Sequence, residues 1–286
     1  MELAVHERKD DITHIALAGR LDATEIEQVG ERLSHITATR QQPTIIDLSG
    51  IEYISSLGIG LLVANAKRVK IAGHKLVLLK PQPMVEEVLR SAKMHKVMPI
   101  AHLLEEAVRL LQTDGSPTTA HDAKPRVVAD RPAPVPEPSV PATSRPSSNV
   151  LKLSIKNQIP ALKALYADVD KFLEAHNIPY RPEYAVNLVL EELIVNIIHY
   201  AHLDDDLHFI DVELNISAGQ IVLRIQDDGR KFDPRESPIN ETDLDLDGME
   251  PGGLGLALVV DMVDVLKYER VDNKNRVEVR IHYGAD

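Results

Sequence analysis

A proline-rich stretch in the middle of the chain divides the sequence into two parts. Residues 114–149 hold Ser, Thr and Ala between the prolines and almost no large apolar side chains. The prolines are Pro117, Pro125, Pro132, Pro134, Pro136, Pro138, Pro141 and Pro146. Such a composition buries too little apolar surface to offset the entropy lost on ordering, so we expect a disordered or extended linker. The sequence therefore predicts domains at 1–113 and 150–286, joined by a tether that spans about 35 Å if flexible.

Length and composition narrow the classes of function. A chain of 286 residues with 44% hydrophobic residues suits two ordinary cores, and no apolar run approaches the roughly 20 residues of a membrane span. The absence of cysteine excludes disulfides, cysteine nucleophiles and thiolate metal sites. A formal net charge of −12 argues against non-specific nucleic-acid binding. We expect a cytoplasmic protein, without a secretory segment or membrane insertion, whose partners are proteins.

In the first part, short β-type runs alternate with amphipathic helical segments. Expected strands are 12–18, 43–48 and 75–79, and expected helices are 24–36, 57–71, 85–93 and 103–111. Alternation of this kind predicts an α/β fold in which helices cover a sheet.

The second part is organised differently. Expected strands are 150–155, 208–216, 220–227, 265–270 and 276–283; expected helices are 161–176, 182–201 and 254–263. The last four strands pair as two hairpins by their spacing, and an acidic loop at 228–252 separates them. This order predicts an α+β fold with helices packed on one antiparallel sheet.

Helix 182–201 is apolar nearly all round, yet it carries Glu192 and Asn196 four residues apart. Residues at this spacing share one helix face, so the carboxylate and the carboxamide point into one space. Both offer the hard oxygens that Mg²⁺ prefers. The pair alone also fits the solvated edge of a core helix.

Two further segments accompany this pair. A predicted strand ends in Asp227, Asp228 and Gly229, where a carboxylate can accept a hydrogen bond from an exocyclic amine. The run PGGLGLAL at 251–258 places glycines at a helix start, where backbone amides can approach phosphate. Each segment alone is also explained as a turn or an ordinary helix start.

The order ExxxN, DxGxxFDP, GGLGLxLV resembles the GHKL (histidine kinase-like) ATPase superfamily over about residues 150–285, and most of all the bacterial anti-sigma serine kinases. The resemblance implies an α+β two-layer sandwich that binds ATP and Mg²⁺. It implies that Glu192 is the general base, that Asn196 holds Mg²⁺, and that Asp227 reads adenine beside Gly229. The implied phosphate-binding residues are Gly253, Leu254, Gly255 and Leu256. Lys231 and Tyr200 depart from the superfamily pattern, and no HExxTP-like phosphoacceptor box occurs, which argues against a histidine autokinase.

The run IIDLSGIEYISSLGIGLL at 45–62 resembles the signature of STAS domains, the anti-sigma factor antagonists, over about residues 1–113. The resemblance implies a mixed sheet with helices and a phosphoacceptor at Ser56, with Ser55 as the alternate. Residue type alone suggests a helix N-cap for Ser56.

The two resemblances together predict a partner-switching regulator, an ATP-dependent kinase that phosphorylates its own Ser56 or a serine of a separate STAS protein. The alternative is a nucleotide-sensing module that holds or releases a partner without turnover; a signalling scaffold is a further alternative. Expected partners are a STAS domain, a sigma factor or a phosphatase, and the sequence leaves open whether the kinase domain forms a homodimer.

Overall fold

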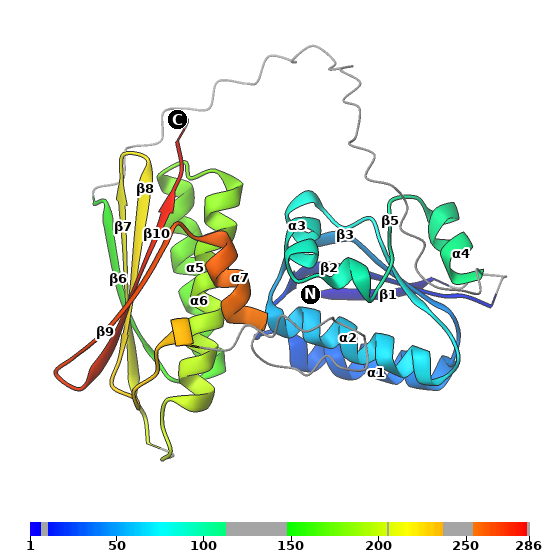
Figure 1. Cartoon of the computed structure of the whole chain (residues 1–286), viewed down its shortest axis with the longest axis horizontal. Coiled ribbons are helices and arrows are strands. Elements are labelled where there is room, and N and C mark those ends of the chain that lie inside the picture. Colours follow the sequence, from blue (N-terminus) through cyan, green and yellow to red (C-terminus); the bar gives the residue numbers. More distant parts are fainter. Residues whose placement is uncertain (7–10, 113–147, 205, 237–253, 285–286) are drawn as a thin grey trace, which may run out of the picture.

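The computed structural model describes residues 1–6, 11–112, 148–204, 206–236 and 254–284. These residues form two units, each with a five-stranded sheet and several helices, that lie side by side with helices between the sheets (Figure 1). Most of the predicted acidic loop (237–252), nearly all of the predicted linker, and Gly253 lie outside the described residues.

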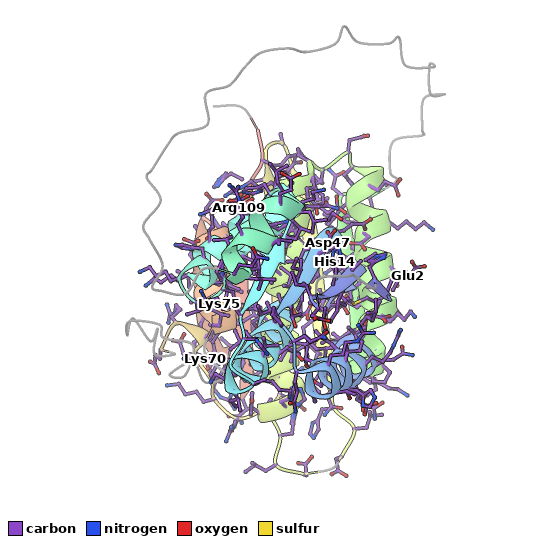
Figure 2. All side chains as sticks on the ribbon, turned by 90° about the vertical axis from the view of Figure 1, so that its right-hand side faces the viewer. Glu2, His14, Asp47, Lys70, Lys75 and Arg109 are labelled. Atoms are coloured by element: carbon purple, nitrogen blue, oxygen red, sulfur yellow. The ribbon has the colours of Figure 1, made fainter. Side chains whose placement is uncertain are left out.

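The N-terminal sheet is mixed and has the order β1-β2-β3-β4-β5. Strands β2 (Thr13–Leu21), β3 (Thr44–Ile54), β4 (Leu76–Leu79) and β5 (Ile100–Ala101) run parallel, and β1 (Glu2–His6) pairs antiparallel with β2. On β2 and β3, His14 and Asp47 lie close together, with Nε2 and Oδ2 3.8 Å apart (Figure 2). Strands β1 and β5 were not predicted: β1 is a half-exposed edge strand and β5 has two residues.

Helices cover the N-terminal sheet as predicted. They are α1 (Ile26–Arg40), α2 (Ser56–Ile71), α3 (Pro83–Ser91), the 3-10 turn η1 (Met94–Lys96) and α4 (Leu104–Gln112). Helices α1 and α2 run side by side along the sheet (Figure 1). This arrangement confirms the expected mixed α/β fold.

The C-terminal sheet is antiparallel throughout, with the order β6-β7-β8-β10-β9. The strands are β6 (Val150–Lys156), β7 (Phe209–Ser217), β8 (Gln220–Asp227), β9 (Val265–Val271) and β10 (Lys274–His282). Helices α5 (Ile159–Ala175), α6 (Tyr180–Tyr200) and α7 (Leu254–Met262) cover one face, and a 3-10 turn, η2 (Pro234–Glu236), follows β8. The opposite face carries charge pairs such as Lys152 with Glu213 (2.8 Å). The two-layer α+β arrangement is therefore confirmed.

The position of helix α6 in the fold explains its apolar composition. Its residues are buried without interruption from Tyr184 to Val195, because the C-terminal unit covers one side and the N-terminal unit contacts the other (Figure 1). A helix covered on two sides is apolar all round, and its few polar side chains then need partners. None of the helices within the described ranges has the length and apolar content needed to cross a membrane.

Candidate functional site

The junction of β3 and α2 fixes the conformation of the two candidate phosphoacceptors. The helix N-cap is Ser55, whose Oγ accepts the backbone N–H of Gly58 (3.3 Å) and donates to the carbonyl of Leu21 (3.3 Å). The interpretation of Ser56 as the cap was therefore wrong by one residue. Ser55 is fully buried, whereas Ser56 is the first residue of the helix and has its hydroxyl free for another partner.

That partner is Glu192 on α6. The Ser56 hydroxyl donates to Glu192 Oε2 at 2.6 Å, and the Ser56 backbone N–H donates to Oε1 at 2.8 Å. Glu192 is 6% exposed. Burial raises its pKa above the usual value, although the two hydrogen bonds from Ser56 act in the opposite direction. The structure thus joins the predicted base and the predicted acceptor directly, although they lie 136 residues apart in the chain.

Gly255, in the first turn of α7, lies directly against the contact of Ser56 with Glu192. A Cβ atom at this position would lie 1.8 Å from Glu192 Oε2 and 3.0 Å from Ser56 Oγ, so no side chain fits. Its neighbour Leu256 is buried, and Leu254 packs against the core. The first described turn of α7 therefore lies beside the carboxylate and the serine.

Asp227, at the end of β8, is 5% exposed and held in a fixed orientation. Its Oδ1 accepts the backbone N–H of Gly229 and the amide of Asn275, each at 2.9 Å. Burial raises the pKa of Asp227, and these hydrogen bonds partly offset the rise. A Cβ on Gly229 would lie 2.4 Å from the Cβ of Ala201, so a glycine is needed for this close approach.

Asn196 lies one helical turn beyond Glu192 on α6 and is partly exposed. Among the described residues, no hydrogen bond joins Asn196 or Asp227 to Glu192. The predicted site residues therefore lie apart, with Glu192 and Asn196 on α6 and Asp227 at the end of β8.

Glu191 is a residue of this region whose role the sequence did not reveal. It is 1% exposed, and its Oε1 accepts the backbone N–H of Ala23 at 2.7 Å. Burial, with the charges of Glu192 and Asp22, raises its pKa to about 8. The available signal was a second glutamate beside Glu192 in an otherwise apolar helix.

Aromatic side chains complete the contact between the two units. The hydroxyl of Tyr184 donates to the carbonyl of Ile54 (2.9 Å) and accepts its N–H (3.1 Å), just before Ser55. The ring of Tyr184 packs on that of Tyr53, with centroids 4.9 Å apart, and Arg20 lies 4.1 Å above the Tyr53 ring. These contacts fix the end of β3, and hence Ser56, against α6.

Comparison with known protein families gives one match in each of the two units. The family model of the histidine kinase-like ATPase domain matches residues 156–281, and that of the STAS domain matches residues 4–107.

Each relative is similar to one part of the chain. A putative anti-sigma factor antagonist, BtrV of Bordetella bronchiseptica, is 26% identical over 104 residues, which are 36% of this chain and 90% of the relative. The serine/threonine-protein kinase BtrW of the same organism is 28% identical over 106 residues, which are 37% of this chain and 75% of the relative. Among solved structures, the unphosphorylated anti-sigma factor antagonist SpoIIAA is 20% identical with a TM-score of 0.34, covering 40% of this chain and 100% of that one. The chain therefore carries a STAS domain in its N-terminal part and a histidine kinase-like ATPase domain in its C-terminal part.

Proposed function

We propose that this chain is a partner-switching regulator whose ATPase domain is a serine kinase that phosphorylates Ser56 of its own STAS domain. The observation that carries the proposal is the 2.6 Å hydrogen bond from the Ser56 hydroxyl to Glu192 Oε2. A general base must lie within hydrogen-bond reach of the proton that it accepts, and this pair meets that condition. Similarity to the kinase BtrW and to the antagonist BtrV supports the same pairing of enzyme and substrate domains.

In the proposed reaction, Glu192 accepts the proton of Ser56 Oγ. This oxygen attacks the γ-phosphorus of ATP, a Ser–O–P bond forms, and the bond from the γ-phosphorus to the bridging oxygen breaks to release ADP. The raised pKa of Glu192 suits this role, because a carboxylate with its ordinary pKa is a weak base near neutral pH. Ser55 is unsuited as the acceptor, since it is buried and its hydroxyl caps α2.

The remaining residues fit a nucleotide. Asp227 has Oδ1 fixed by Gly229 and Asn275, and in the proposal its carboxylate accepts the adenine amino group. The amides at the start of α7, at Leu254, Gly255 and Leu256, receive the phosphates, and Gly253 is assigned to the same role from the sequence.

Glu192 and Asn196 offer hard oxygens from one face of α6, which suits Mg²⁺. We assign the metal to Asn196. When bound, Mg²⁺ neutralises charge on the transferred phosphoryl group.

Phosphorylation would change the contact between the domains. The product carries close to two negative charges, and they would lie against the buried carboxyl of Glu192. The STAS domain is therefore expected to leave α6 after transfer and to become available to another protein. By the similarity to an anti-sigma factor antagonist, the partner would be a sigma-factor regulator, a sigma factor or a phosphatase.

The test is to incubate the full-length chain with Mg²⁺ and γ-labelled ATP and to map the phosphate by peptide mass spectrometry. We expect label on Ser56, which Ser56→Ala and Glu192→Gln abolish and the matched control Ser55→Ala retains. Mixing the Ser56→Ala chain with the Glu192→Gln chain distinguishes transfer within one chain from transfer between chains. Label on Ser55, or absence of label when ATP is bound, would contradict the proposal.

A second candidate is a nucleotide-sensing module that binds and releases a partner without turnover. The observation in its favour is that Glu192 binds Ser56 through both its hydroxyl and its backbone N–H, as a docking residue does. With Glu192→Gln, a pure binding module would keep control of its partner, whereas a kinase would lose it along with phosphorylation.

A further inference from the structure

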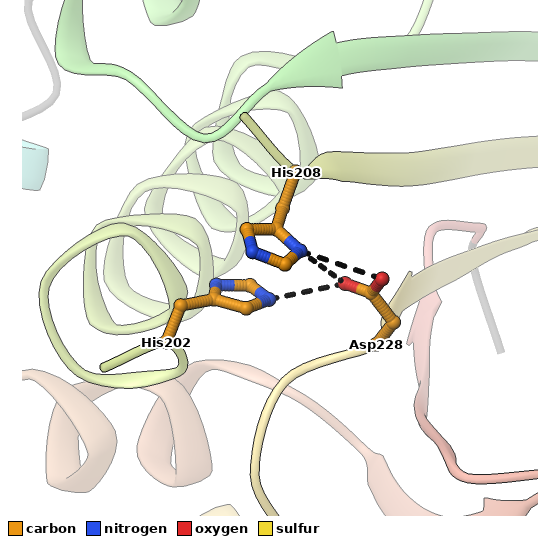
Figure 3. Close-up of side chains that lie close together, drawn as sticks. All are labelled: His202, His208 and Asp228. Atoms are coloured by element: carbon orange, nitrogen blue, oxygen red, sulfur yellow. Dashed lines mark hydrogen bonds and ion pairs between the residues drawn. The ribbon is translucent and has the colours of Figure 1, made fainter. Parts of the chain in front are cut away.

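Three side chains from separate segments converge beyond the end of α6. His202 follows α6, His208 precedes β7, and Asp228 follows β8. His202 Nε2 lies 3.0 Å from Asp228 Oδ1, and His208 Nδ1 lies 3.2 Å from the same oxygen. Figure 3 shows both rings directing one nitrogen toward this carboxylate.

The two imidazoles are held in place by their surroundings. Their rings are stacked, with centroids 3.6 Å apart and planes inclined by 17°. The side chain of His202 is 7% exposed and that of His208 is 20% exposed. The second nitrogen of His208, Nε2, lies 2.9 Å from Oδ1 of Asp204.

We propose that His202, His208 and Asp228 form a binding site for a divalent transition-metal ion of the Zn²⁺ type, with water completing the coordination. Two imidazoles and one carboxylate are a usual ligand set for such ions. Ligands about 2.0–2.1 Å from Zn²⁺ lie roughly 3–3.5 Å from one another in a tetrahedral site. The candidate ligand atoms all lie within 4.8 Å of one another, and two pairs are at 3.0 and 3.2 Å.

The contact of His208 with Asp204 supports the metal site. A histidine ligand ordinarily donates its other ring N–H to a carboxylate, which fixes the tautomer and the ring orientation. Here Asp204 holds Nε2, which directs the lone pair of Nδ1 toward Asp228 and His202.

A plain hydrogen-bond network is the competing explanation. Asp228 would then accept from both rings, and each ring would need its proton on the nitrogen that faces Asp228. His208 also contacts Asp204 through Nε2, so in this network it would carry protons on both nitrogens and place a charged ring on the stacked ring of His202. A single cation between the three groups instead binds His202 Nε2, His208 Nδ1 and the carboxylate together.

The test uses the full-length chain, stripped of metal with EDTA and kept free of nucleotide. Co²⁺ is titrated as a spectroscopic probe and Zn²⁺ as a competitor. We expect one Co²⁺ per chain, with visible d–d absorption that Zn²⁺ abolishes. His208→Gln and His202→Gln should abolish this absorption, and Asp204→Asn should weaken affinity about 10- to 100-fold.

The matched control is His282→Gln, because His282 forms an exposed pair with Asp264 (3.1 Å) and belongs to no group of three potential metal ligands among the described residues. It should leave affinity and absorption unchanged. Circular dichroism checks that each variant folds. If Co²⁺ binds His208→Gln and the parent chain equally, or if the parent binds no more than the double variant His202→Gln, His208→Gln, the site is refuted.

Discussion

Gly255 lies where any side chain would collide with the carboxylate of Glu192. Replacing it by alanine puts a Cβ 1.8 Å from Oε2, so the carboxylate must turn away and lose its hydrogen bonds to Ser56. We therefore expect Gly255→Ala to reduce phosphorylation of Ser56 by at least 100-fold, as loss of a positioned general base typically does. The reduction is measured as the ratio of the initial rates of label incorporation into the parent chain and into Gly255→Ala.

The control for Gly255→Ala is Gly60→Ala in α2, because a Cβ at residue 60 meets nothing within 4 Å. Alanine is favoured over glycine inside a helix by about 1 kcal/mol, so this variant should fold and phosphorylate normally. Normal phosphorylation in Gly255→Ala would show that the contact between Ser56 and Glu192 is not the one used in transfer.

We expect Glu191 to make docking of the two domains depend on pH. Its pKa is about 8 when the domains are docked, above the usual 4.5, so the docked state binds the proton more tightly than the separated state, in which water reaches the carboxyl. Docking is therefore strongest at low pH and weakens as pH rises from about 5 to 8, by at most about tenfold per unit for one proton. Burial also raises the pKa of Glu192, which adds in the same direction.

The distance between spin labels measures this pH dependence. The chain has no cysteine, so one cysteine introduced on α4 and one on α5 give unique labelling sites. Glu191→Gln keeps an acceptor for the N–H of Ala23 and carries no titrating proton. In this variant the distance between the labels should therefore vary less with pH. If docking of Glu191→Gln depends on pH as strongly as docking of the parent chain, other groups cause the pH dependence.

At the scale of the elements, the end of β3 and helix α6 are joined by the hydroxyl of Tyr184. Tyr184→Phe removes its two hydrogen bonds with Ile54 and leaves the N–H and the carbonyl buried in the contact. Docking should weaken by about 1–3 kcal/mol. The control is Tyr283→Phe, whose hydroxyl contacts Ser217 within the ATPase domain. If both variants separate the domains equally, the effect comes from the fold of the ATPase domain rather than from docking.

The strongly periodic elements could be predicted from the sequence, and most of their bounds agree within a few residues. Strands β1 and β5 could not, because a half-exposed edge strand and a two-residue strand owe their existence to pairing with distant partners. The families could be recognised because their motifs are local. The direct contact of Ser56 with Glu192 could not be predicted, since it depends on how two separate domains pack.

At the scale of the whole molecule, modification of Ser56 is expected to separate the domains. Ser56→Glu places a carboxylate against that of Glu192, which is buried, and like charges in such a position repel strongly. Small-angle X-ray scattering should show a larger radius of gyration for Ser56→Glu than for the parent chain. Ser56→Ala removes the hydroxyl without adding charge and should remain compact; equal expansion of both variants would show that loss of the hydrogen bond, rather than charge, opens the chain.

The attached STAS domain, docked on α6, also competes with every separate STAS protein that would bind the same face of this helix. Covalent attachment presents that domain at an effective concentration that is on the order of millimolar. A free STAS protein that uses the same face of α6 must outcompete it, so a dilute or weakly bound rival remains excluded while Ser56 occupies Glu192. In the proposed reaction, phosphorylation of Ser56 removes this competitor and makes the ATPase domain accessible to substrates in trans. The proposal therefore implies an order of events, in which the chain modifies itself first and its partners afterwards.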